Sequence, residues 1–139
     1  MKHSMLLVLT AAALALTACG QSQADKAKAQ VCDARADIQK HVESLQGLTL
    51  STATLDGVST SLKAIRDDLG KIKDAQGDLK SDRKQQVQDA NQQFEAQVKS
   101  VTQNVGKNLS IKDAGSQLKQ AATKLADSYQ QTLAKVDCG

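Results

Sequence analysis

The residues of this 139-residue chain that are best suited to chemistry are its cysteines, Cys19, Cys32 and Cys138, and its histidines, His3 and His41. A thiol can be acylated, oxidised to a disulfide or bound to a metal, and an imidazole can transfer protons or ligate zinc. A zinc site needs three or four such ligands at close spacing, whereas these residues are scattered. No Gly-x-Ser-x-Gly turn and no glycine-rich phosphate loop occurs. We therefore predict no metal site, no cofactor and no enzymatic activity.

Charged residues near His41 and in the middle of the chain are expected to face solvent. His41 follows Asp37 by one helical turn, a spacing that favours a surface ion pair. The glutamine-rich segment 84–97 can line a partner helix or simply meet water. A run of acidic residues alternates with basic ones and lacks the ligand spacing of a calcium loop, which predicts a solvated helix face. This run comprises Lys63, Arg66, Asp67, Asp68, Lys71, Lys73, Asp74 and Asp78.

The residues before Cys19 indicate an export signal. Lys2 precedes an apolar run over residues 5–16, which has the length of a signal-peptide core, whereas a membrane-spanning helix needs roughly 20 apolar residues. The run closes with Leu16-Thr17-Ala18-Cys19, which resembles the lipobox of bacterial lipoproteins; the alternative is a plain secretory signal. The resemblance implies that residues 1–18 are a signal peptide, that cleavage follows Ala18, and that diacylglycerol and further acyl chains such as palmitate are attached at Cys19.

Lipid on Cys19 is the membrane attachment that we expect, because no second apolar stretch of comparable length follows. Two or three acyl chains hold a protein stably on a membrane, whereas one chain binds only reversibly. The resemblance therefore implies a lipid-anchored protein on the extracytoplasmic face of a membrane in the cell envelope. It does not decide between an inner and an outer membrane.

The composition downstream of the signal peptide excludes a nucleic-acid partner. Removing residues 1–18 takes away one of the 18 basic residues and none of the 15 acidic ones, so the net charge falls from +3 to about +2. Phe94 and Tyr129 are the only aromatic residues, which leaves little for base stacking. Ala, Gln, Asp, Lys and Leu dominate, and proline is absent, which favours helices. We expect residues 19–28 to form a lipidated tether and residues 29–139 to form one helical domain.

Apolar residues recur every three or four positions in four segments, the pattern of amphipathic helices. Gly47 is predicted to cap the first helix, with residues 48–52 as a connector, and Ser110 to cap the last helix with Asp113 in its first turn. The four stripes are Val31, Ala34, Ile38, Val42 and Leu45; Leu55, Val58, Leu62, Ile65, Leu69, Ile72, Ala75 and Leu79; Val87, Ala90, Phe94, Val98, Val101 and Val105; and Ile111, Ala114, Leu118, Ala121, Leu125, Tyr129, Leu133 and Val136.

The interval between Leu79 and Val87 leaves the number of helices open. Eight residues separate them, one more than a heptad, so the chain either turns there or continues as one helix with a stutter. A single helix over residues 52–107 would be about 80 Å long, which is too long for a compact domain. We therefore favour the turn. The predicted fold is all-α: an antiparallel, coiled-coil-like helical bundle of three or four helices, four being preferred.

Cys32 and Cys138 form an even pair of thiols in a chain with an export signal, which favours a disulfide. An even number of antiparallel helices would bring these two positions together. We expect the first helix to be shorter than the last, with residues 48–54 compensating for the difference in height. Two free thiols, an intermolecular bridge and half of a metal site are the alternatives.

The overall pattern is similar to that of small, uncharacterised exported helical proteins of actinobacteria, in which a Cys-Asp-Ala-Arg-like start and a terminal cysteine bracket amphipathic helices. Here these elements are Cys32-Asp33-Ala34-Arg35 and Cys138. The resemblance covers residues 32–138 and implies no activity.

Two functions are compatible with these features. The first is a membrane-anchored structural or protein-interaction module, whose partner would be another envelope protein. The alternative is a carrier that binds a lipid or another apolar ligand between its helices. A carrier of this kind would need a cavity lined by Leu62, Ile65, Phe94 and Leu125.

Overall fold

The computed structural model describes residues 22–51, 55–108 and 114–139. Within them the chain forms four α-helices, α1 (Gln23–Ser51), α2 (Leu55–Gln76), α3 (Ser81–Asn108) and α4 (Ala114–Gln131), followed by the short 3-10 helix η1 (Leu133–Lys135). The predicted all-α fold is confirmed, with the preferred number of helices. The lipobox, Cys19, Ser110 and Asp113 lie outside the described residues.

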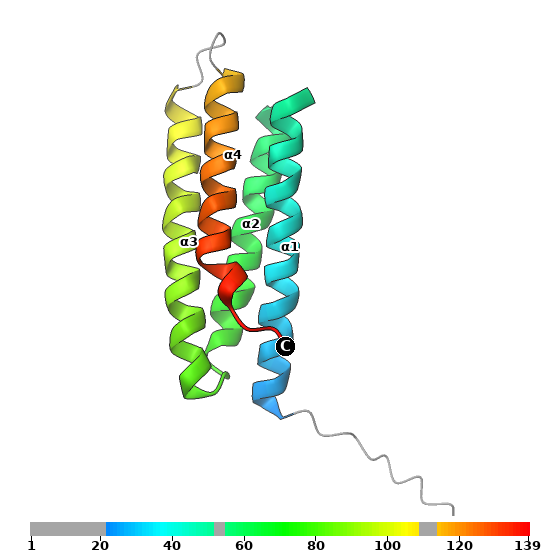
Figure 1. The fold of residues 1–139 in the computed structure, drawn as a ribbon, viewed down its shortest axis with the longest axis vertical. Helices are drawn as coiled ribbons and strands as arrows, with labels where there is room; N and C mark the ends of the chain where they lie inside the picture. Colours follow the sequence, from blue (N-terminus) through cyan, green and yellow to red (C-terminus); the bar gives the residue numbers. More distant parts are fainter. Residues whose placement is uncertain (1–21, 52–54, 109–113) are drawn as a thin grey trace, which may run out of the picture.

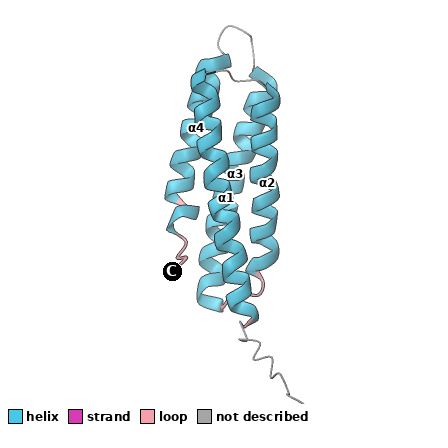
Figure 2. Ribbon diagram, turned by 90° about the vertical axis from the view of Figure 1, so that its right-hand side faces the viewer, coloured by secondary structure: helices cyan, strands magenta, loops and turns pink. Residues whose placement is uncertain are grey.

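The helices run alternately up and down and lie side by side (Figure 1). Helix α1 packs against α2 and α4, and α3 packs against the same two helices from the other side. The chain does turn between α2 and α3, but at residues 77–80, earlier than the predicted interval after Leu79. The amide of Asp78 donates to the carbonyl of Ala75 at 3.1 Å, and that of Leu79 donates to Gln76 at 3.3 Å. Figure 2 shows the same antiparallel arrangement from the side.

The predicted stripes meet in a single core. Every stripe residue with a described side chain is buried except Ala121, which is partly buried while its neighbour Ala122 takes the core position. The rings of Phe94 and Tyr129 meet edge to face with their centroids 6.0 Å apart. Because each helix has only one apolar face, the four helices are stable only when packed together.

Helix α1 is longer at both ends than predicted. It begins at Gln23, so residues 23–28 belong to the helix and not to the tether, and Ala27 is buried. The signal that sequence reasoning missed is Ser22, whose hydroxyl oxygen accepts the Asp25 amide at 3.2 Å and whose hydroxyl donates to the Asp25 carboxylate at 2.8 Å.

The cap predicted at Gly47 is also wrong, because α1 continues through Gly47 to Ser51 with no positive φ at this glycine. A glycine permits a left-handed cap without imposing one, and the backbone groups keep their helical hydrogen bonds when the helix continues. The first helix is therefore longer than the last, 29 residues against 18. Residues 48–51 of the predicted connector belong to α1, and residues 52–54 lie outside the described residues. Near Cys32, η1 and the C-terminal residues extend the chain beyond the end of α4.

Candidate functional site

A disulfide closes the end of the bundle at which α1 begins. Cys32 of α1 is bonded to Cys138, with a distance of 5.7 Å between the α-carbons. The bridge links residues 106 positions apart and is the pair predicted from the sequence. The C-terminus consequently lies against the lower part of α1 (Figure 1).

Hydrogen bonds hold the C-terminal residues on both sides of the disulfide. Arg35 donates from Nη1 to the carbonyl oxygens of Val136 at 2.5 Å and Ala134 at 3.4 Å. The hydroxyl of Tyr129 donates to the carbonyl of Arg35 at 3.3 Å, and its burial raises the pKa of this phenol. The space next to Cys32, Val136 and Asp137 has a volume of only about 10 Å³. We call these contacts around the disulfide the clamp.

The clamp extends to α3 through Arg83 and Asp137. Arg83 donates from Nη1 to the carbonyl of Asp137 at 2.9 Å and from Nη2 to its carboxylate at 3.1 Å. The backbone amide of Gly139 donates to the same carboxylate at 2.9 Å. This amide and, secondarily, the Arg83 charge lower the pKa of Asp137.

The ion pair predicted between His41 and Asp37 is wrong. Asp37 instead accepts a hydrogen bond from Lys40 at 3.1 Å, while Nε2 of His41 lies 3.7 Å from a carboxylate oxygen of Asp68 on α2. The spacing along α1 allows Asp37 to pair with either Lys40 or His41. The contact between His41 and Asp68 depends on the packing of α1 against α2. His41 is therefore part of an interhelical contact.

The solvated face predicted on α2 is correct for Asp67 and wrong for Asp68. Asp67 is exposed and pairs with Lys63 at 2.9 Å. The side chain of Asp68 is only 5% exposed and lies 2.7 Å from Nζ of Lys71, a hydrogen bond that raises the pKa of this amine. None of the described hydrogen bonds joins His41 to a hydroxyl or thiol that could act as a nucleophile, and the described residues contain no group of three or more potential metal ligands.

The glutamine-rich segment contains one polar residue that the sequence did not single out. Asn91 is 2% exposed, and its Nδ2 donates to the carbonyl of Leu69 on α2 at 3.4 Å. Its Oδ1 is buried and has no hydrogen-bond partner among the described residues. The rest of the segment is mostly exposed, apart from the apolar stripe.

The interior holds little free space where a carrier would need it. Leu62, Ile65, Phe94 and Leu125 are all buried in the core. The space next to Leu62 and Leu125 has a volume of about 10 Å³, which is room for about one water molecule. An acyl chain requires far more volume than this.

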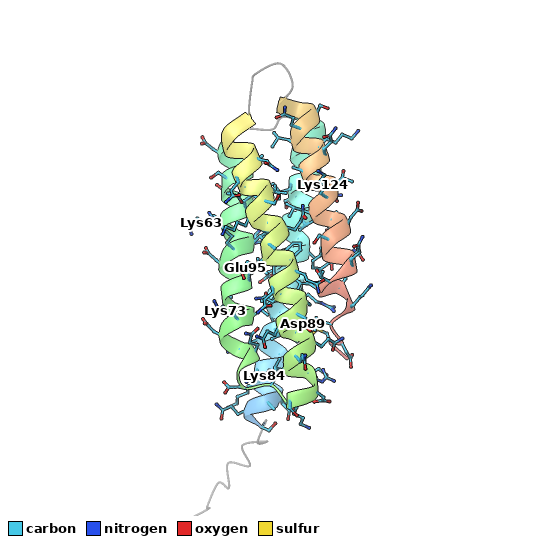
Figure 3. The ribbon with its side chains drawn as sticks, turned by 90° about the vertical axis from the view of Figure 1, so that its left-hand side faces the viewer. Lys63, Lys73, Lys84, Asp89, Glu95 and Lys124 are labelled. Carbon is cyan, nitrogen blue, oxygen red and sulfur yellow. A yellow bond between two sulfur atoms is a disulfide. The ribbon has the colours of Figure 1, made fainter. Side chains whose placement is uncertain are left out.

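A larger hollow lies on the outside, between α2 and α3. This basic groove has a volume of about 610 Å³. Its apolar floor consists of Leu69, Gly70 and Val98, and its charged groups are Arg66, Lys73, Lys99 and Glu95, a net charge of +2. Sequence reasoning missed this groove. Gly70, which follows Leu69 in the middle of an amphipathic helix, could have indicated a shallow place on the surface of α2. In Figure 3, Lys73 on α2 and Glu95 on α3 appear on the same face.

A second, acidic groove lies on the other flank of α2, between α1 and α2. Its volume is about 300 Å³. Its charged residues are Asp33, Asp37, Asp74 and Lys71, a net charge of −2, and Gln30 and Ala34 complete its lining. Helix α2 thus separates two surfaces of opposite charge.

Comparison of the chain with protein-family models, curated proteins and solved structures gives no match. Among the described residues, no helix has both the length and the apolar character needed to cross a membrane.

Proposed function

We propose that this chain is the precursor of a lipoprotein, anchored through Cys19 on the extracytoplasmic side of a membrane, whose helical bundle acts by binding other proteins and has no catalytic role. The observation that carries the proposal is the apolar run that ends in Leu16-Thr17-Ala18-Cys19. The Cys32–Cys138 disulfide supports it, because stable disulfides are typical of oxidising compartments outside the cytoplasm.

The tether would hold the bundle close to the membrane. Four Cα steps separate Cys19 from Gln23, where α1 begins, so they span at most about 15 Å. The end of the bundle that carries the start of α1 also carries the α2–α3 turn and the C-terminus (Figure 1). This end would face the lipid, and the long flanks of α2 and α3 would face neighbouring molecules.

An interaction role is favoured over a carrier role by where free space occurs. The core position suited to an apolar ligand has about 10 Å³, whereas the basic groove has about 610 Å³ and is open to solvent. An open groove between two helices, with an apolar floor and charged rims, is suited to receiving a protein surface. The carrier alternative would have to use this external groove.

The anchor is tested by replacing Cys19 with alanine in the chain expressed in bacterial cells that are fed a labelled fatty acid. We expect the native chain to take up label and to fractionate with membranes, and Cys19→Ala to lose the label completely. The double variant Cys32→Ser/Cys138→Ser is the matched control, because it changes the other two thiols and should keep the label. Full labelling of Cys19→Ala would refute the proposal.

A further inference from the structure

The basic groove has the form of a helix-docking seam. On α2 its lining residues are Arg66, Leu69, Gly70 and Lys73, spaced at i, i+3, i+4 and i+7, and Glu95, Val98, Lys99 and Thr102 on α3 have the same spacing. Both stripes therefore cover two helical turns, about 10 Å in length. A surface of this form accepts one face of another helix.

Gly70 deepens the middle of this groove without serving the fold. It lies inside α2, and a Cβ built on it would meet nothing within 4 Å. Glycine is a poorer helix former than alanine, and neither a positive φ nor a close internal contact requires it here. The space that it leaves would allow a partner helix to approach the backbone of α2 closely.

The charges of the two grooves are opposite in sign, and most of these charged side chains form no ion pair within the molecule. Arg66, Lys73 and Lys99 in the basic groove have no ion-pair partner within 4.0 Å among the described residues. The same holds for Asp33 and Asp74 beside the acidic groove. The +2 and −2 net charges thus match each other.

The two grooves also lie at nearly the same height. On α2 the basic groove is lined by residues 66–73 and the acidic one by residues 71–74, so their midpoints differ by about three residues, or roughly 5 Å. Two copies with the same polarity can therefore meet side by side. If the proposed function holds, the anchor would impose this common polarity.

We propose that the basic groove is a self-association site, and that its occupant is the acidic flank of a second copy of this chain, in which helix α1 carries Asp33 and Asp37 and α2 adds Asp74. Asp33 and Asp37 on α1 of one copy would face Lys73 and Arg66 on α2 of its neighbour. Each copy carries one basic and one acidic surface, so the contact is heterologous and extends into rows or rings of molecules.

The test uses two charge-reversed forms of the full chain. Variant one is Arg66→Glu/Lys73→Glu, which inverts the charge of the basic groove on α2. Variant two is Asp33→Lys/Asp74→Lys, which inverts the acidic flank. All four side chains are exposed, so we expect both variants to fold. The matched control is Lys119→Glu/Lys124→Glu, which makes the same change of charge as variant one on exposed positions of α4.

Sedimentation of the purified chain at low salt, over a range of concentrations, measures self-association. We expect the native chain and the control to associate, and each variant alone to associate at least tenfold more weakly, because like charges would then face each other. An equimolar mixture of the two variants should recover association, since each supplies the surface that complements the other. Added salt should weaken all of these contacts.

Carbodiimide cross-linking of mixed light and isotope-labelled copies provides an independent readout. Cross-links between copies should join Lys73 to Asp33, Asp37 or Asp74, and they should disappear in each variant. The inference is refuted if the native chain stays monomeric, or if both variants associate as the native chain does. It is also refuted if vesicles of anionic lipid bind the native chain and not variant one while no association occurs, because the groove then receives lipid.

Sedimentation is carried out with all variants in the Cys19→Ala chain, so that acyl chains cannot cause the association. This choice also separates the inference from the proposed function. If Cys19 is not lipidated but the purified chain still associates through the two grooves, only the anchor is lost. If Cys19 is lipidated and the purified chain is monomeric, only the self-association site is lost.

Discussion

At the scale of single residues, the environment decides which chemistry a side chain can perform. Cys32 is consumed by a disulfide, and Asp68 is buried between Lys71 and His41. A buried carboxylate needs such partners, because an unpaired charge in the core is strongly destabilising. His41 and Asp68 therefore contribute to how α1 and α2 fit together.

Asn91 provides the prediction at this scale. Its buried Oδ1 has no partner among the described residues, and leaving such an atom unsatisfied costs about 1–3 kcal/mol. We expect Asn91→Leu, which keeps the branched shape, to raise the free energy of unfolding by about 1 kcal/mol in chemical denaturation. Asn91→Asp should lower it, because it buries a charge. If Asn91→Leu were destabilising by a similar amount, this atom would have a partner in solution.

At the scale of elements, α2 contributes to the core, to the contact with α1 and to both grooves. One stripe of α2 enters the core, one flank meets α1 through Asp68, and the other forms the floor of the basic groove with Leu69 and Gly70. Its 22 residues thus combine a folding role with two exposed surfaces of opposite charge. The sequence of such a helix can therefore include a residue, such as Gly70, that lowers its stability.

Gly70→Ala tests this conflict directly. The added methyl group meets nothing within 4 Å, so the native fold accommodates it. Alanine should raise the free energy of unfolding by about 0.5–1 kcal/mol through its better helix propensity. The same variant should weaken self-association, because the methyl group occupies the space offered to the neighbour. Thermal denaturation and sedimentation measure the two effects; a variant that is both more stable and fully associating would contradict a docking role for Gly70.

At the scale of the whole molecule, the disulfide joins the first helix to the last residues of the chain. Closing a loop of 106 positions restricts the unfolded chain, an effect of about 4.7 kcal/mol in the chain-entropy model. Arg35 and Arg83 hold the same residues by hydrogen bonds, so the native geometry does not depend on the bridge alone.

Reduction should therefore destabilise the bundle without abolishing its helices. We expect the free energy of unfolding to fall by about 2–5 kcal/mol in reducing buffer, with a helical circular dichroism spectrum retained at low temperature. The Cys32→Ser/Cys138→Ser variant should show the lower stability already and respond no further to reductant. Free alkylation of both thiols in the unfolded, unreduced protein would show that the bridge is absent.

Much of the fold was accessible from the sequence because helical periodicity is a local property. The recurrence of apolar residues every three or four positions identifies the buried face of each helix without reference to its neighbours. The irregular interval after Leu79 indicated that the chain turns between α2 and α3, although the turn itself lies at residues 77–80, and the even pair of cysteines identified the bridge. The helix boundaries were less accessible, since Gly47 allows either a cap or continuation, and Ser22 was not recognised as a start signal.

What lies between helices was decided only by the tertiary structure. The pairing of His41 with Asp68, the burial of Asn91 and the two grooves beside α2 depend on how far each helix is rotated about its axis and shifted along its neighbours. That rotation and shift are set by the packing of all four stripes at once, so no single stripe contains the information. The sequence by itself determined which residues turn inward; the packed bundle determined which polar residues meet at its surface.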